Sequence, residues 1–550
     1  MVGFSNRRWL VASLSASLAL ATGCSFVDDQ GVLPEVRVPD APELSERATV
    51  VAGIAIQADT GEPVETATIT IGGPSVDRVR NGAGAPQTVF EGSGGFVSFE
   101  VEGDGEIDLN VSARAPGHLA TSRRVLLDSG ERQSFEVRLV RREVDATGRV
   151  TSVPRGASGL VAEADISQED LEVEAPQATR RDGSAGGGSA ALWVPQGTAA
   201  LDEDGNQVAI GAAEATVVYF NTDNDDALES FPGGFAVRVD RDPDEASLAS
   251  GGADGMFISG AFAAFEMADD QGNPISEFAS PITASLEVPA GTVNPQTGEE
   301  AQEGDDFPIW SFDPDGGEWT FEQNGVVEGT NEENDNLIVS FETDHLSYWN
   351  IGWFSSDTCT ARIRVEGADE RRLRLSASRR DGGAGFLSSG WYTGTDEFPL
   401  RRAPADLPLV IRATLDGEVV GSVTTDNVCD HATSATALAL PVDLPEEESG
   451  SVTVNVVEEC PDGAHRRGIP SSSVWYREGS GLYQPARDTD TSGVSTIVSA
   501  RAGDVTVRAE NRRTGGVFPA QTVAVGADEV AEVTFSHNMD CRIVTGGAGE

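Results

Sequence analysis

The residues that could do chemistry are few, and the densest run of oxygen ligands is Asn221-Thr222-Asp223-Asn224-Asp225-Asp226. Carboxylate and amide oxygens at alternate positions of a loop can converge on Ca²⁺, so Asn221, Asp223 and Asp225 are candidate calcium ligands. The run lacks the Gly at position six and the Glu at position twelve of an EF-hand loop. A solvated acidic loop explains the same residues, and we favour that interpretation over a calcium site.

A second group of candidates is aromatic and consists of Trp310, Trp319 and Trp349. Aromatic rings on an exposed surface could stack on sugars and form a carbohydrate-binding platform. Aromatic side chains at strand ends more often close the core of a β-sandwich. The sequence therefore favours a place in the core and keeps ligand binding as the alternative.

Catalytic motifs are missing from the sequence. None of the five histidines lies in an HExxH motif, so the zinc site of a metalloprotease is not predicted. A GxSxG nucleophile elbow, a P-loop and a strand-linked GxGxxG are also missing. We therefore expect a non-enzymatic protein with no cofactor, calcium being the one alternative.

Four cysteines lie in the C-terminal part of the chain: Cys359, Cys429, Cys460 and Cys541. An even number without a CxxC motif indicates disulfides rather than metal ligands in an exported chain. Three connectivities are possible for four cysteines. Residues 356–445 and 450–545 each carry one cysteine near the first strand and one near the end, which favours Cys359–Cys429 and Cys460–Cys541.

The fifth cysteine, Cys24, follows an apolar segment from Trp9 to Ala21 that is preceded by Arg7 and Arg8. This is the layout of a secretory signal, too short to span a bilayer. The stretch Leu20-Ala21-Thr22-Gly23-Cys24 resembles the lipobox of bacterial lipoproteins. The resemblance implies that residues 1–23 are a signal peptide and that Cys24 carries lipid, palmitate included. It also implies a lipid-anchored protein of the bacterial cell envelope, at the outer membrane; an ordinary signal peptide is the alternative.

The chain of 550 residues is strongly acidic, with 90 Asp and Glu against 38 basic residues and a formal charge of −52. Every basic residue is Arg, because the sequence contains no Lys. Such a surface disfavours nucleic acid as a partner. Frequent Gly and Pro, scarce helical periodicity and common Val/Ile/Thr alternation indicate an all-β protein.

The polar residues 24–47 predict a flexible tether, and residues 48–141 predict a small β-sandwich with six or so strands. Four segments of the sandwich resemble the carboxypeptidase regulatory-like, transthyretin-like domain, which in that family is an accessory domain that binds or spaces. They are Val51-Ala52-Gly53, Asp59-Thr60-Gly61-Glu62-Pro63-Val64, Ala67-Thr68-Ile69-Thr70-Ile71 and Ala115-Pro116-Gly117-His118.

Residues 142–355 predict a larger central β-domain with an internal repeat. The pattern LxVPxGT begins at Leu192 and recurs at Leu286, and a Pro followed by Gly ends a strand in a turn. The pieces Trp310-Ser311-Phe312-Asp313 and His345-Leu346-Ser347-Tyr348-Trp349-Asn350 resemble extracellular β-domains of cartilage intermediate layer protein. That resemblance implies a fold and an extracellular setting, and no activity.

Residues 356–445 and 450–545 predict two further sandwiches, so the expected fold is tandem transthyretin-like or Ig-like β-sandwiches around the central domain. We expect a lipid-anchored envelope protein with an adhesive, scaffold or spacer role. Its expected partners are the membrane, through the N-terminal lipid, and envelope proteins or polysaccharide. The alternative is a carbohydrate-binding accessory lipoprotein.

Overall fold

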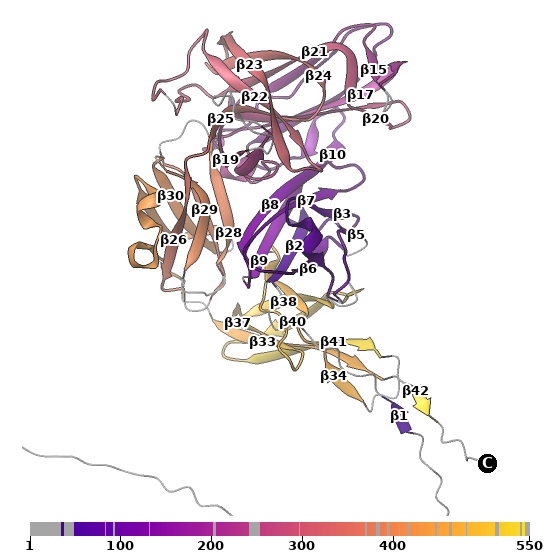
Figure 1. Cartoon of the computed structure of the whole chain (residues 1–550), viewed down its shortest axis with the longest axis vertical. Helices are drawn as coiled ribbons and strands as arrows, with labels where there is room; N and C mark the ends of the chain where they lie inside the picture. The colour runs from indigo at the N-terminus through magenta and orange to yellow at the C-terminus, as the bar shows by residue number, and fades with distance from the viewer. Residues whose placement is uncertain are drawn as a thin grey trace, which may run out of the picture.

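The structure is a computed structural model. It describes residues 35–37 and 49–544 apart from 83, 92–93, 131, 202–204, 241–252, 296, 369–370, 381–384, 393–396, 406, 416, 446–447, 461–464, 480, 512–515 and 540–541. Nearly every described element is a β-strand, so the all-β prediction is confirmed (Figure 1). The helical elements in this part of the chain are α1 (Asp225–Leu228), η1 (Val76–Arg78), η2 (Val428–His431) and η3 (Ser434–Thr436).

The first two sheets form the N-terminal sandwich, with the strand orders β4-β6-β2-β9 and β5-β3-β7-β8. β2 and β9 run parallel. Alternate side chains such as Val51, Phe99 and Leu109 point inward and form one buried core between the sheets. The strands are β2 (Thr49–Gln57), β3 (Thr68–Gly72), β4 (Val79–Arg80), β5 (Val89–Phe90), β6 (Phe96–Val101), β7 (Glu106–Arg114), β8 (Thr121–Asp128) and β9 (Arg132–Leu139).

A short hairpin, β10 (Arg141–Val144) and β11 (Val150–Ser152), leads into the central sheet of 14 strands. Its main path is β12-β17-β19-β25-β22-β23-β24-β21-β14-β13, and four short strands pair off this path. The strands are β12 (Ala157–Asp165), β13 (Leu171–Glu174), β14 (Ala190–Val194), β15 (Ala199–Leu201), β16 (Gln207–Ala209), β17 (Ala212–Phe220), β18 (Ala236–Val239), β19 (Ala253–Asp269), β20 (Pro274–Ile275), β21 (Glu277–Val288), β22 (Asp306–Asp313), β23 (Glu318–Thr330), β24 (Leu337–His345) and β25 (Tyr348–Ser355).

The LxVPxGT repeat forms the same turn twice, at the ends of the paired strands β14 and β21. In the first copy the hydroxyl of Thr198 donates to the carbonyl of Pro195 at 2.7 Å, and Thr292 does the same to Pro289. The glycine before each threonine has a φ near +80°, a conformation that glycine adopts without steric cost. The repeat is therefore a turn signal that ends two neighbouring strands.

The third unit, the disulfide sandwich, has the sheets β29-β26-β32 and β28-β27-β30-β31. One continuous hydrophobic core extends from the central sheet into this sandwich, from Phe257 and Trp310 to Leu375 and Leu409. The strands are β26 (Thr358–Glu366), β27 (Leu373–Arg379), β28 (Leu387–Tyr392), β29 (Phe398–Pro404), β30 (Leu409–Leu415), β31 (Glu418–Thr425) and β32 (Leu438–Pro441).

The C-terminal sandwich pairs one sheet of β34, β33, β37 and β41 with a second of β36, β35, β38, β39 and β40. Its strands are β33 (Ser449–Glu459), β34 (Arg466–Gly468), β35 (Ser473–Glu478), β36 (Gln484–Pro485), β37 (Val494–Arg501), β38 (Gly503–Asn511), β39 (Gly516–Val517), β40 (Gln521–Val525) and β41 (Val530–Asn538). The first and last described strands pair with each other, because β1 (Glu35–Arg37) runs antiparallel beside β42 (Arg542–Val544).

The four units are stacked rather than strung out (Figure 1). The central sheet lies at one end, the N-terminal and disulfide sandwiches lie beneath it, and the C-terminal sandwich follows, with β1 and β42 at the far end. The N-terminal sandwich contacts all three other units. Asn110 donates to the carbonyl of Pro314 in the central sheet, and Arg401 of the disulfide sandwich pairs with Asp128 at 3.0 Å. The hydroxyls of Ser98 and Ser473 lie 2.8 Å apart at the contact with the C-terminal sandwich.

Candidate functional site

A cavity of about 750 Å³ lies where the four units meet. The N-terminal sandwich contributes β8, β9 and part of β2, and the central sheet contributes Gly233–Ala236 before and at the start of β18. The disulfide sandwich contributes β28 and β29 with the start of β27, and the C-terminal sandwich contributes Ser473–Trp475 and Pro485–Asp488. No unit by itself encloses this space, so the cavity is a product of their docking.

The wall of the cavity reverses the charge balance of the chain. The whole sequence has more than twice as many acidic as basic residues. Basic residues nevertheless outnumber acidic ones in this wall by eight to four. The arginines are Arg123, Arg124, Arg138, Arg372, Arg374, Arg401, Arg402 and Arg487, and the acids are Glu136, Glu229, Glu397 and Asp488. A low-dielectric cleft that concentrates one sign of charge attracts ions of the other sign.

Strand alternation explains why arginines line the cavity. In β9 the side chains of Phe135, Val137 and Leu139 enter the core of the N-terminal sandwich, so Glu136 and Arg138 point out of it. In β27 the core residues Leu373 and Leu375 leave Arg374 on the outer face in the same way, with Arg372 just before it. Docking of the sandwiches then brings these polar outer faces together.

One wall of the cavity holds a buried ion-pair network that joins three units. Arg374 of the disulfide sandwich contacts Glu136 of the N-terminal sandwich and Glu229 of the central sheet, both at 2.9 Å. Arg138 also pairs with both carboxylates. The four side chains are between 7% and 16% exposed.

The charges in this network hold one another in the ionised state. Burial by itself would raise the pKa of Glu136, but the adjacent Arg374 and Arg138 outweigh it, and the pKa of Glu136 is lowered. Burial would likewise lower the pKa of Arg374, yet Glu136 and Glu229 raise it. Glu136 and Arg374 are therefore charged at neutral pH, each favoured in that form by its neighbours.

A second network lies on another wall and again joins three units. Arg124 of β8 donates to both carboxylate oxygens of Asp108, at 2.8 and 2.6 Å, and to Asp254 of the central sheet at 2.7 Å. Arg238 of β18 reaches the same two carboxylates. Arg402 of the disulfide sandwich contacts Asp254 at 3.4 Å. Two sets of charge-assisted contacts thus fix the units around the cavity.

Aromatic packing closes the end of the cavity beside the C-terminal sandwich. Phe96 of β6 meets Trp475 and Tyr483 edge to face, with ring centroids 5.6 and 5.5 Å apart. The guanidinium of Arg508 lies 4.8 Å from the Phe96 ring centroid. These side chains form a separate small buried cluster between the two sandwiches, which makes the contact apolar as well as polar.

Two of the three candidate calcium residues, Asn221 and Asp225, make side-chain contacts within the protein. Asn221 is buried, and its side-chain oxygen accepts from the backbone N–H of Asp223 at 2.9 Å. Asp225 begins α1 and pairs with Arg181 at 2.9 Å and Arg412 at 3.3 Å. Across the residues that the structure describes there is no group of three or more His, Cys, Asp or Glu that could hold a metal ion.

The candidate aromatic residues lie in the core. Trp310, Trp319 and Trp349 are each fully buried. Trp310 and Trp319 both meet Phe257 edge to face, at 4.9 and 5.3 Å between ring centroids. A ring enclosed in this way presents no face to a sugar, so the three tryptophans pack the central sheet and form no exposed platform.

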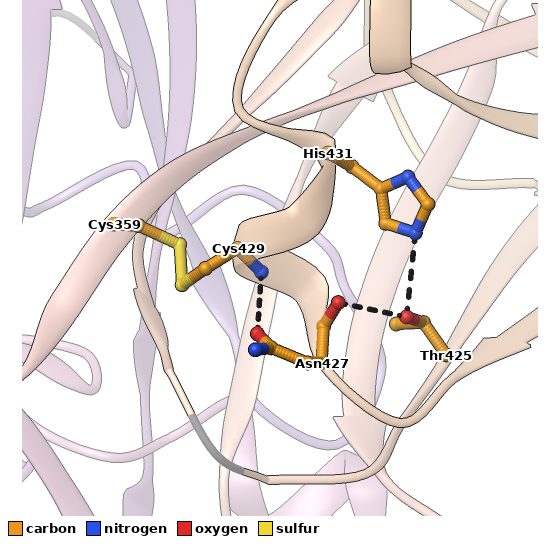
Figure 2. Close-up of a disulfide and its surroundings, with 5 residues drawn as sticks. All are labelled: Cys359, Thr425, Asn427, Cys429 and His431. Carbon is orange, nitrogen blue, oxygen red and sulfur yellow. Dashed lines mark hydrogen bonds between the residues drawn. A yellow bond between two sulfur atoms is a disulfide. The ribbon is translucent and has the colours of Figure 1, made fainter.

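The disulfide Cys359–Cys429 is present and ties β26 to η2 across a separation of 70 residues (Figure 2). The side-chain oxygen of Asn427 caps η2 by accepting from the backbone N–H of Cys429 at 2.9 Å. The hydroxyl of Thr425 donates to the carbonyl of Asn427 at 3.0 Å. Cys460 is also disulfide-bonded, whereas Cys24 and Cys541 lie outside the described residues.

The sequence did not single out the cavity arginines. The available signal was the clustering of arginine in pairs within an acidic chain, as at Arg123-Arg124, Arg371-Arg372 and Arg401-Arg402. Such pairs are far apart in the sequence, and nothing local shows that they meet. The cavity became visible only once the four units were placed together.

Comparisons with known proteins yield no family for this chain. No family model and no curated protein sequence matches it. Among solved structures, a minor pilin of Streptococcus agalactiae covers 33% of this chain and 96% of its own, at 12% identity and a TM-score of 0.16. The major pilin subunit of Bacillus cereus covers 89% and 99%, at 8% identity and a TM-score of 0.13. The TIE protein of Bacillus anthracis covers 80% and 72%, at 9% identity and 0.13. Likenesses this weak support no argument about fold or function.

Within the described part of the chain, no helix has the length and apolar character needed to cross a membrane.

Proposed function

We propose that this chain is a lipid-anchored protein of a bacterial cell envelope that acts as a non-enzymatic scaffold or spacer. The observation that carries the proposal is the buried network of Arg374, Glu136, Glu229 and Arg138, which joins three β-units into one body. Flexible tandem modules would not need buried ion pairs at their junctions. A rigid stack holds its far end at a fixed distance from its anchor.

The position of the chain ends supports a spacer role. The proposed lipid site, Cys24, lies 11 residues before the start of β1 at Glu35, and β1 pairs with β42 at the end of the stack away from the central sheet (Figure 1). A lipid at Cys24 would therefore place the C-terminal sandwich near the membrane. The central sheet would then face away from it, toward envelope proteins or polysaccharide.

The non-enzymatic part of the proposal draws on the cavity. The described residues that line it include four carboxylates but no histidine, the most frequent general base, and no cysteine nucleophile. The carbohydrate-binding alternative depended on an aromatic platform. Because those tryptophans are buried, we do not extend the proposal to sugar binding through them.

The anchor is tested with Cys24→Ser in the full-length chain, expressed in a bacterial host and separated by detergent phase partitioning. We expect the wild-type protein in the detergent phase and the variant in the aqueous phase, because a cysteine thiol is required for lipid attachment. Ser25→Ala is the matched control and should partition like the wild type. A Cys24→Ser variant that stays in the detergent phase would refute the lipid anchor.

A further inference from the structure

The cavity wall has more positive charge than its own carboxylates neutralise. Arg138 and Arg374 pair with Glu136 and Glu229, and Arg124 pairs with Asp108 and Asp254. In the described part of the chain, no carboxylate lies within ion-pair distance of Arg123 or Arg372, although Glu136 and Glu229 act on Arg123, and Asp488 on Arg372, from farther away. Arg123 donates only to the backbone carbonyl of Ser389, at 3.3 Å. Two guanidinium groups in the wall are therefore left for a partner from outside the chain.

Burial makes these two unpaired charges costly. Burial lowers the pKa of Arg372 despite the attraction of Asp488, and burial with repulsion from Arg374 lowers the pKa of Arg123 despite the attraction of Glu229 and Glu136. Both arginines are partly buried, and a charge withdrawn from water without a direct counter-ion costs stability. If the arginines only joined the units, Arg372 would be expected to contact a carboxylate of a neighbouring unit, as Arg374 does. The missing direct contact is explained if a ligand supplies a further negative charge.

Buried hydrogen-bond donors without acceptors in the same wall also indicate a ligand. Arg124 is only 5% exposed, and its Nη1 has no hydrogen-bond partner among the described residues. Arg374 Nε and Trp475 Nε1 are likewise buried without an acceptor. These three groups can only donate, so they require a ligand rich in acceptors. Gln133 Oε1 is a buried acceptor without a donor in this wall, and a ligand hydroxyl group would satisfy it.

The remaining lining sets the size and shape of the ligand. A volume of about 750 Å³ falls within the range of small-molecule sites. Phe398, Trp475 and Leu126 also line the cavity, so a ligand with a carbon skeleton would cover apolar surface. Arg372 and Arg374 are two residues apart on extended chain, about 7 Å, and can therefore contact one small molecule together.

We propose that the junction cavity binds a small hydroxylated organic anion, with a carboxylate or phosphate group held by Arg372 and Arg123. Both groups present oxygen acceptors that match the planar guanidinium. Binding would add contacts from all four units to one molecule, so the ligand would also strengthen their docking. The proposal does not depend on the lipid anchor, because it concerns only residues of the folded stack.

The test uses the full-length chain purified in detergent and three probes built on one sugar ring: glucuronate, glucose 6-phosphate and neutral glucose. Isothermal titration calorimetry measures affinity, and thermal melts with sodium chloride at matched ionic strength separate binding from screening. Binding of glucuronate identifies carboxylate recognition, and binding of glucose 6-phosphate identifies phosphate recognition. Either supports the proposal, provided that glucose binds at least about tenfold more weakly.

Variants assign the binding to the named arginines. Arg372→Gln and Arg123→Gln should each weaken binding of the charged probe about tenfold or more, the loss expected for a charge-assisted hydrogen bond. Neither substitution leaves a carboxylate unpaired, so both proteins should remain folded by circular dichroism. Arg380→Gln removes the same charge from an exposed pair with Asp426 outside the cavity and is the matched control.

The proposal is overturned if neither acidic probe binds, if glucose binds as tightly as they do, or if both cavity variants bind like Arg380→Gln. Any of these results would leave the arginines as structural charges between the units. It would not affect the lipid anchor, which is measured by partitioning.

Discussion

Removing one carboxylate from the buried network should uncouple the units. Glu136→Gln leaves Arg374 and Arg138 with Glu229 as their shared carboxylate, while Arg123 adds a further positive charge nearby. Breaking a buried pair by removing one partner costs about 3–5 kcal/mol. Because the Glu136 side chain is only 7% exposed, solvent screens little of that effect.

A loss of 3 kcal/mol should lower the midpoint of thermal unfolding by at least about 6 °C in a unit of 150–250 residues. Differential scanning calorimetry is the assay, because four units need not unfold in one transition and calorimetry resolves separate ones. The control is Glu102→Gln, which removes a carboxylate 58% exposed that pairs with Arg80 in the same sandwich. That exposed ion pair should contribute little to stability, so the unfolding midpoint of the control should stay close to the wild-type midpoint.

The pH dependence of thermal stability provides a second test. The lowered pKa of Glu136 fixes the direction of the expected effect. The pKa of Glu136 is lowered in the folded protein from an ordinary value of 4.5, mainly by Arg374 and Arg138 acting against burial. Its contribution is therefore fully present above pH 4.5 and is lost as the pH falls through the lower folded pKa. The difference in unfolding midpoint between the wild type and Glu136→Gln should be large at pH 7 and should become small at acidic pH. Equal midpoints for the two proteins at pH 7 would refute the network as the connection between the units.

The other predictions concern the disulfide and the surface charge. Replacing Cys359 and Cys429 together by Ala should cost about 4 kcal/mol in the loop-entropy model for a separation of 70 residues. Calorimetry of the double variant, with non-reducing peptide mapping of the wild type, checks this, and an unchanged midpoint would contradict it. With a net charge of −52, the midpoint should rise with sodium chloride as the screening length falls from about 30 Å at 0.01 M to about 3 Å at 1 M. Millimolar calcium at matched ionic strength should add little, and a calcium-specific rise abolished by Asp223→Asn would instead reveal a site.

The sequence by itself determined the local structure. Alternating Val, Ile and Thr with frequent turn residues indicate strands, because side chains on an extended chain alternate between a buried and an exposed face. The repeated LxVPxGT pattern predicted two strand ends, and both copies end a strand in the same turn. Large aromatic residues such as Trp310 were favoured for the core, where the structure places them.

Only the tertiary structure decided the cavity and its charge. Alternation shows that Arg138 on β9 and Arg374 on β27 lie on outer faces, but it does not show which outer faces meet. Two residues so far apart in the sequence contact the same carboxylates because separate sandwiches dock. The docking depends on the shapes and charges of whole surfaces, and these exist only after each sheet has folded. The cavity that we propose as a ligand site is therefore the one that no local sequence pattern encodes.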